Sequence, residues 1–119
     1  MNPLLMSAAA EFTATGQVQI GTIPAQAVPT KYALQVTGVD ANGAVVAVTA
    51  WDVQLIGGLD NLAFNESSKI LEHVQTSQKN GDTIYSSGAF FPARYWVIKC
   101  KALTLGAAVK IKVQAIGVN

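Results

Sequence analysis

Apolar and polar residues alternate along most of this chain, most regularly in its last quarter. Residues 94–102 and 109–115 place an apolar side chain at every second position. Side chains of a β-strand point alternately to opposite faces, so each segment predicts a strand with one buried face. The inward positions are Trp96, Ile98, Cys100, Ala102, Val109, Ile111, Val113 and Ala115. With a turn at 103–107 between them, the two strands are predicted to pair as one ribbon.

Four lysines fall on the opposite parity of these two strands, namely Lys99, Lys101, Lys110 and Lys112. If the strands pair as one ribbon, the four lysines share one basic face, where like charges repel mildly. Two interpretations of this face stay open. It could dock on an acidic surface of a partner protein, or it could be an ordinary solvated strand face.

The same period of two recurs upstream. Further strands are predicted at 15–23, 31–39, 44–56 and 83–91, separated by turn signals such as the Asn-Gly pair at 42–43. The residues predicted to fill a core between two sheets are Trp51, Val53, Leu55, Trp96, Ile98, Ile111 and Val113. About eight short strands without a long helical pattern predict an all-β fold, an antiparallel β-sandwich of the jelly-roll kind.

One stretch, residues 66–78, fits either a helix or a strand. Ser67 and Ser68 could cap a short helix, whereas residues 70–74 could form a strand. The uniform β pattern of the remaining chain favours the strand.

The N-terminal residues 1–14 lack a strong period and are predicted to form an extended arm ahead of a single domain at 15–119. The arm is too short to have its own core. We therefore expect its apolar residues to contact another chain: Leu4, Leu5, Met6 and Phe12.

An aromatic group surrounds the start of the last ribbon, and most of it is expected in the core. Its members are Tyr85, Phe90, Phe91, Tyr95 and Trp96. The adjacent pair Phe90 and Phe91 cannot both point inward from a regular strand. One of the two is therefore expected at a bend, exposed, or in an interface with a partner.

Charge is sparse and balanced. Only 13% of the 119 residues are charged, with 8 basic and 7 acidic residues. Nucleic-acid binding needs a strong positive excess, so it is not expected. No apolar run approaches the roughly 18 residues of a membrane span, so no membrane partner is expected either. A domain with so little charge is poorly protected from association, which favours a homo-oligomer, a dimer or trimer.

No pattern of catalytic or metal-binding residues is evident. The single cysteine, Cys100, lies in the apolar parity of a strand, and nothing places the single histidine, His73, beside it. Asp52, Glu66 and Glu72 have no spacing that predicts a carboxylate pair. We expect no catalytic site, no metal and no cofactor.

Two segments carry a family resemblance. Residues 51–64 run from a strand into a Gly-Gly-Leu-Asp turn that ends on Phe64, and residues 93–99 read Ala-Arg-Tyr-Trp-Val-Ile-Lys. This pattern resembles small β-sandwich domains, jelly-roll-like or galactose-binding-like, of tailed-phage structural proteins. The match covers about residues 31–118, with lysines where that family often has arginines and with a long stretch at 65–83.

The resemblance implies a virion structural protein without enzymatic activity. The expected role is a head decoration or cement protein that bridges neighbouring capsid subunits, with the major capsid protein or other virion proteins as partners. Its location would be the virion, assembled in the host cytoplasm. The alternative is a carbohydrate- or receptor-binding module of a phage tail fibre or baseplate, because fold alone does not choose between these roles.

Overall fold

The fold was obtained as a computed structural model, which describes residues 4–22, 29–58, 64–86, 93 and 95–118. The described elements are β1 (Leu4–Phe12), β2 (Gly16–Thr22), β3 (Lys31–Val39), β4 (Ala50–Gly58), the 3-10 helix η2 (Glu66–Ser68), β5 (Lys69–Gln75), β6 (Gly81–Tyr85), β7 (Tyr95–Thr104) and β8 (Lys110–Val118). The ambiguous stretch at 66–78 is therefore mainly the strand β5, as the alternation favoured.

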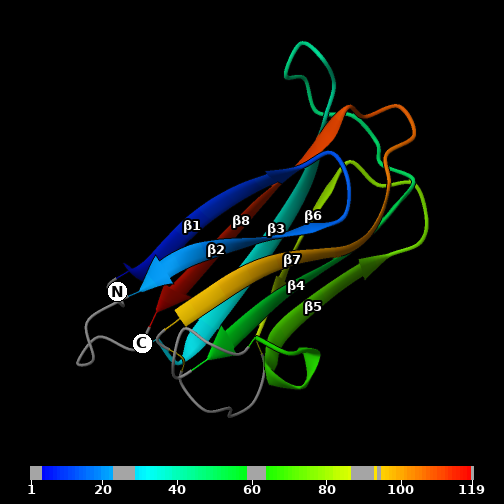
Figure 1. Cartoon of the computed structure of the whole chain (residues 1–119). Coiled ribbons are helices and arrows are strands. Elements are labelled where there is room, and N and C mark those ends of the chain that lie inside the picture. Colours follow the sequence, from blue (N-terminus) through cyan, green and yellow to red (C-terminus); the bar gives the residue numbers. More distant parts are fainter. Residues whose placement is uncertain (1–3, 23–28, 59–63, 87–92, 94, 119) are drawn as a thin grey trace.

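The strands form two antiparallel sheets of four strands each, packed face to face (Figure 1). Sheet A has the order β1-β8-β3-β6, and sheet B has the order β2-β7-β4-β5. Consecutive strands change sheet at every step except β4 to β5, which pair directly. This order is the double Greek key of an eight-stranded jelly roll, so the predicted fold class is confirmed.

The core between the sheets is filled by the alternate residues that the sequence pattern selects. All seven residues predicted for the core are almost fully buried: Trp51, Val53, Leu55, Trp96, Ile98, Ile111 and Val113. Trp96 on β7 donates a hydrogen bond of 3.3 Å from Nε1 to the Tyr32 hydroxyl on β3. One side chain pair thus links the two sheets through the centre of the core.

The N-terminal segment is not the separate arm that its weak period predicts. Residues 4–12 are β1, which pairs with β8 at the edge of sheet A. Met6, Ala10 and Phe12 belong to the core of this same chain. The correction has a simple cause: Met6 and Phe12 are buried within the chain's own domain, on an edge strand that adds backbone hydrogen bonds to the sheet.

The last two strands do not pair with each other, which corrects the predicted ribbon. β7 lies in sheet B between β2 and β4, and β8 lies in sheet A between β1 and β3. The turn after β7 crosses from one sheet to the other. Val109, which the alternation placed inward, precedes β8 and is exposed.

Candidate functional site

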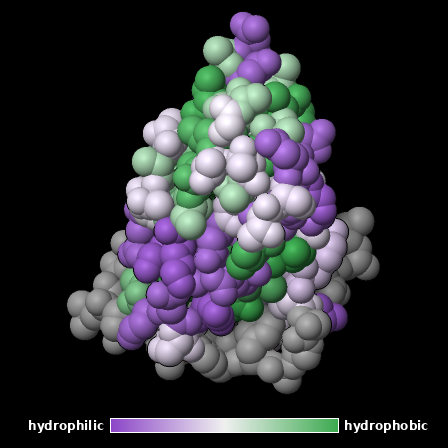
Figure 2. Space-filling view, turned by 90° about the vertical axis from the view of Figure 1, so that its right-hand side faces the viewer, coloured by the Kyte–Doolittle hydropathy of each residue, from purple (hydrophilic) through white to green (hydrophobic). Residues whose placement is uncertain are grey.

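A network of polar side chains covers part of the outer face of sheet B. Its centre is Gln54 on β4, whose amide nitrogen donates hydrogen bonds of 2.9 Å to Glu66 and to Glu72. Lys101 forms an ion pair of 2.8 Å with Glu66, and Lys69 forms one of 2.7 Å with Glu72. Figure 2, which faces the side where β5 and β6 lie, shows hydrophilic residues gathered in a broad patch low on this side.

Asp52 on β4 extends this network to a pair of carboxyl groups. Glu72 acts on Asp52 both as a hydrogen-bond partner for its protonated form and as a neighbouring negative charge. Burial, together with Glu72, raises the pKa of Asp52 to about 6. The Lys69 ammonium, followed by the bond to Asp52, holds the pKa of Glu72 at about 2. The pair therefore keeps one proton across a wide pH range.

Asp52 and Glu72 interact closely enough for a hydrogen bond between them to shift both pKa values. Glycosidases instead place the substrate bond between two carboxyl groups about 5 Å or more apart. Within the described residues, no group of three or more histidine, cysteine, aspartate or glutamate side chains is arranged to hold a metal. The Asp52–Glu72 pair is not predictable from alternation, because alternation reveals the outer parity of β4 but not its register with β5.

The carboxyl pair predicts a titration near neutral pH. Asp52 should titrate with a midpoint near pH 6, and Glu72→Gln should lower that midpoint, because the shared hydrogen bond and the neighbouring charge are lost. Carboxyl ¹³C chemical shifts followed by NMR would measure both. Glu11→Gln is the control, since Glu11 pairs with Lys110 on the other sheet. A midpoint below about 4.5 in the wild-type chain would contradict the pairing.

The same pair sets the sign of a stability change with pH. Between about pH 4 and pH 6 the folded chain keeps a proton on Asp52 that the unfolded chain has released, so stability falls as pH rises through this window. Below about pH 4 the unfolded chain also binds a proton at Glu72, whereas in the folded chain Glu72 stays ionised down to about pH 2. Stability therefore falls on further acidification. The pair's contribution is thus greatest near pH 4.

A buried histidine lies where β5 meets β6 at the side of the sandwich. His73 accepts a hydrogen bond of 3.2 Å at Nδ1 from Trp51 Nε1, and its Nε2 lies 3.8 Å from Asp82. Burial lowers the pKa of His73, although Asp82 opposes that shift. Burial thus favours the neutral form of this imidazole. Cys100 is buried as predicted, and burial raises the pKa of its thiol to about 11, so it is no nucleophile.

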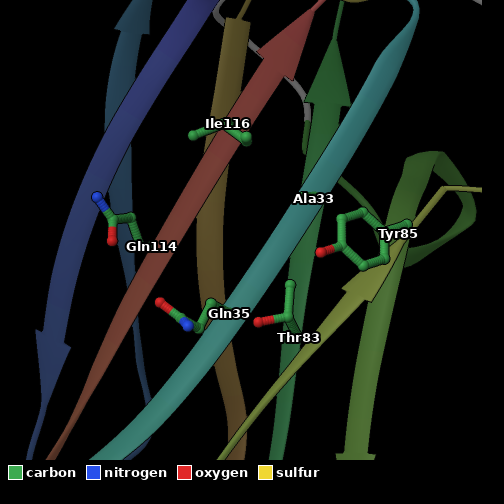
Figure 3. A pocket seen from close by; sticks show the side chains of 6 residues that line it. All are labelled: Ala33, Gln35, Thr83, Tyr85, Gln114 and Ile116. Carbon is green, nitrogen blue, oxygen red and sulfur yellow. The ribbon is translucent and has the colours of Figure 1, made fainter.

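The outer face of sheet A carries a different feature, a shallow hollow of about 310 Å³. We call it the sheet-A hollow and define it by its lining residues: Ala33, Gln35, Thr83, Tyr85, Gln114 and Ile116. Figure 3 shows their side chains on β3, β6 and β8. Tyr85 belongs to the aromatic group of which most members are expected in the core, and it is 71% exposed here.

The four lysines predicted to form one row lie on two opposite faces. Lys99 and Lys101 belong to β7 in sheet B, and Lys110 and Lys112 belong to β8 in sheet A. Lys101 pairs with Glu66, and Lys110 pairs with Glu11 at 2.9 Å. No single basic surface results, because the chain crosses between the sheets after β7.

The other predicted contact residues have mixed outcomes. Met6 and Phe12 are buried in the chain's own core, which removes them as partner contacts. Residues Leu4 and Leu5 begin β1, but their side chains lie outside what the structure describes. Phe90 and Phe91 also lie outside the described residues, so that prediction stays a prediction.

The two segments that carry the family resemblance meet in space. Gly57 on β4 is paired with Trp96 on β7, and Gly58 is paired with Tyr95. A Cβ at Gly57 would lie 2.5 Å from the Cβ of Ala93 and 2.8 Å from Ile70. Glycine is therefore required at position 57 so that the second segment can pack against it.

Comparisons with known proteins give distant structural similarities only. No protein-family model matches the chain, and no curated protein sequence matches it. The mitogen of Yersinia pseudotuberculosis aligns with a TM-score of 0.48 and 10% identity over 100% of this chain and 88% of its own. A low-affinity xylan-binding module, CBM86 of Roseburia intestinalis, aligns with a TM-score of 0.38 and 14% identity over 99% and 89%.

A third solved structure, of nora virus, aligns with a TM-score of 0.32 and 9% identity over 95% of this chain and 54% of its own. At these scores none of the three assigns a role to this chain. In the described part of the chain, no helix is long and apolar enough to cross a membrane.

Proposed function

We propose that this chain is a non-enzymatic structural protein of a phage virion, specifically a head decoration protein that bridges neighbouring capsid subunits. The observation that supports this proposal is that the described parts of the two segments that carry the family resemblance, residues 51–64 and 93–99, lie next to each other in the fold. Residues 51–58 and 95–100 form the paired central strands of sheet B, with the close contact of Gly57 and Ala93 at one end. Motifs far apart in the sequence thus form one structural unit.

The role would be adhesive, and it would need no chemistry. The partners would be the major capsid protein or other virion proteins, and the chain would act as a dimer or trimer at a symmetry axis of the particle. Its location would be the assembled virion. The paired carboxyls and the neutral His73 both have structural explanations within the domain, so neither calls for a catalytic role.

An apolar end of the sandwich takes the place of the arm as the contact surface. We call it the apolar end and define it by five exposed residues: Ala41, Ala44, Val45, Ala107 and Val109. The amide of Val109 donates to the carbonyl of Val39, and Val39 also bridges to Val45, so Val45 and Val109 flank the end of β3. Val45 is 59% exposed and Val109 is 45% exposed, and burying such side chains against a capsid favours attachment.

The composition of purified particles tests this proposal. Virions separated on a density gradient should contain the chain at a fixed ratio to the major capsid protein. The Val45→Asp, Val109→Asp double variant should be folded but depleted from those particles, because two charges would be buried in the contact.

A further inference from the structure

The sheet-A hollow is built from two neighbouring rows of side chains that cross three strands. In one row Gln35 on β3 is paired with Gln114 on β8 and with Thr83 on β6. In the other row Ala33 on β3 is paired with Ile116 and with Tyr85. The rows lie two positions apart along each strand, so both point to the same outer face. A polar row therefore runs directly beside an apolar one.

The smallest side chain stands in the middle of the apolar row, and this makes the surface concave. Ala33 separates the two larger residues Ile116 and Tyr85, so its methyl group forms the floor between them. Figure 3 shows the Tyr85 ring reaching from β6 toward β3, with its hydroxyl end nearest β3 and one face of the ring turned outward. Such a ring is a platform on which a flat apolar surface can stack.

The polar row offers hydrogen-bonding groups that the described part of the chain does not use. No hydrogen bond between described residues occupies the side-chain amides of Gln35 and Gln114 or the hydroxyl of Thr83. Each glutamine amide can both donate and accept. None of the six lining residues is charged. The chemistry therefore suits a neutral ligand with many hydroxyl groups and one apolar face.

Other ligand classes fit this surface less well. An anionic ligand would require a cation among the lining residues, and the sheet-A hollow has none, because Lys31 lines only the adjoining second hollow. A peptide added as a strand would pair with the free edge of β6, because β3 and β8 are paired on both sides. It would then lie beside the hollow, in the plane of the sheet, and not on the outer face that the hollow occupies. A lipid chain would need an enclosed apolar cavity, whereas this hollow is open and three of its six lining residues are glutamine or threonine.

We propose that the sheet-A hollow is a binding site for a neutral glycan. A pyranose ring would stack its apolar face on Tyr85 and Ala33, and its hydroxyl groups would bond to Gln35, Gln114 and Thr83. A second hollow of about 250 Å³ shares Ala33, Tyr85 and Ile116 and continues toward Lys31 and Val118. The site therefore has room for more than one sugar unit in line. This inference is independent of the proposed virion role.

The test is affinity electrophoresis of the purified full chain in native gels that contain one polysaccharide each. The neutral probes are β-glucan, xylan, galactomannan and starch, and the anionic probe is polygalacturonate. We expect at least one neutral probe to retard the chain. Tyr85→Ala should weaken that binding about tenfold or more, whereas Tyr85→Phe should retain it, because stacking uses the ring. Val74→Ala is the control, because the side chain of Val74 is exposed on β5 of the other sheet.

Gln35→Ala should also weaken binding, since it removes a hydrogen-bonding group from the polar row of the hollow. Thermal unfolding would show that each variant is folded, as expected for changes at exposed side chains. The proposal is overturned if no neutral probe retards the chain, if retardation is unchanged in Tyr85→Ala, or if only polygalacturonate retards it. Loss of particle attachment in Tyr85→Ala without any glycan binding would identify the hollow as a protein contact instead.

Discussion

Replacing Trp96 by alanine should lower the free energy of unfolding by about 3–5 kcal/mol. Trp96 is fully buried at the centre of the core, and its indole donates the hydrogen bond to Tyr32 that links the two sheets. The substitution leaves a cavity between the sheets and also leaves the Tyr32 hydroxyl without that donor. Urea unfolding followed by circular dichroism would measure the loss.

Val74→Ala is the control for this experiment, because Val74 is 55% exposed on β5. Its effect should stay within about 0.5 kcal/mol. Trp96→Phe should fall between the two, since it keeps most of the apolar volume and removes the hydrogen bond. A loss below about 1 kcal/mol for Trp96→Ala would mean that the inward parity of β7 is wrong.

A methyl group added at Gly57 should destabilise the chain by about 1–3 kcal/mol. The new Cβ would overlap the Cβ of Ala93 at 2.5 Å, and real Cβ atoms do not approach so closely. Gly16→Ala is a matched control on the same sheet, because its nearest neighbour is an atom of Phe12 at 3.8 Å. Denaturant midpoints of the two variants would separate overpacking from the general effect of replacing glycine.

A double-mutant cycle identifies the contact responsible. Ala93→Gly removes the atom that overlaps, so it should be less harmful in the Gly57→Ala chain than in the wild-type chain. A coupling energy of about 0.5 kcal/mol or more is expected for residues in direct contact. If Gly57→Ala is as harmless as Gly16→Ala, the two resemblance segments do not pack as described.

The sequence predicts the strands and their inward faces well, because alternation depends on local burial. Trp51, Val53 and Ile111 were placed in the core from parity alone, and all are buried. The bounds of β3 at 31–39 also agree with the alternation. The fold class follows from the number of strands and the absence of a helical period.

The pattern of the sequence does not predict which strands pair with each other across the two sheets. A short turn between two alternating strands usually makes a hairpin, yet β7 and β8 lie in different sheets because the jelly roll crosses at that turn. The predicted lysine row fails for this reason. The Asp52–Glu72 contact and the rows around Ala33 depend on register between strands, which local alternation does not specify.

The N-terminal segment shows a second limit. Alanines at positions 8–10 weaken the apparent period, so residues 1–14 resemble an arm more than a strand. The pairing of Glu11 with Lys112 and of Phe12 with Ile111 nevertheless places them in sheet A. An edge strand needs only one partner and a few anchors, here Met6 and Phe12, so its signal in the sequence is weak.

The central claim, that this chain is a virion structural protein, is tested most directly by its copy number in purified particles. Quantitative mass spectrometry of gradient-purified virions would give the ratio of the chain to the major capsid protein, with the Val45→Asp, Val109→Asp variant as the control for specific attachment. We expect a constant ratio across preparations, commensurate with capsid symmetry, and a lower ratio for the variant. A chain that is absent from intact particles, or present at a ratio that varies with washing, would contradict it.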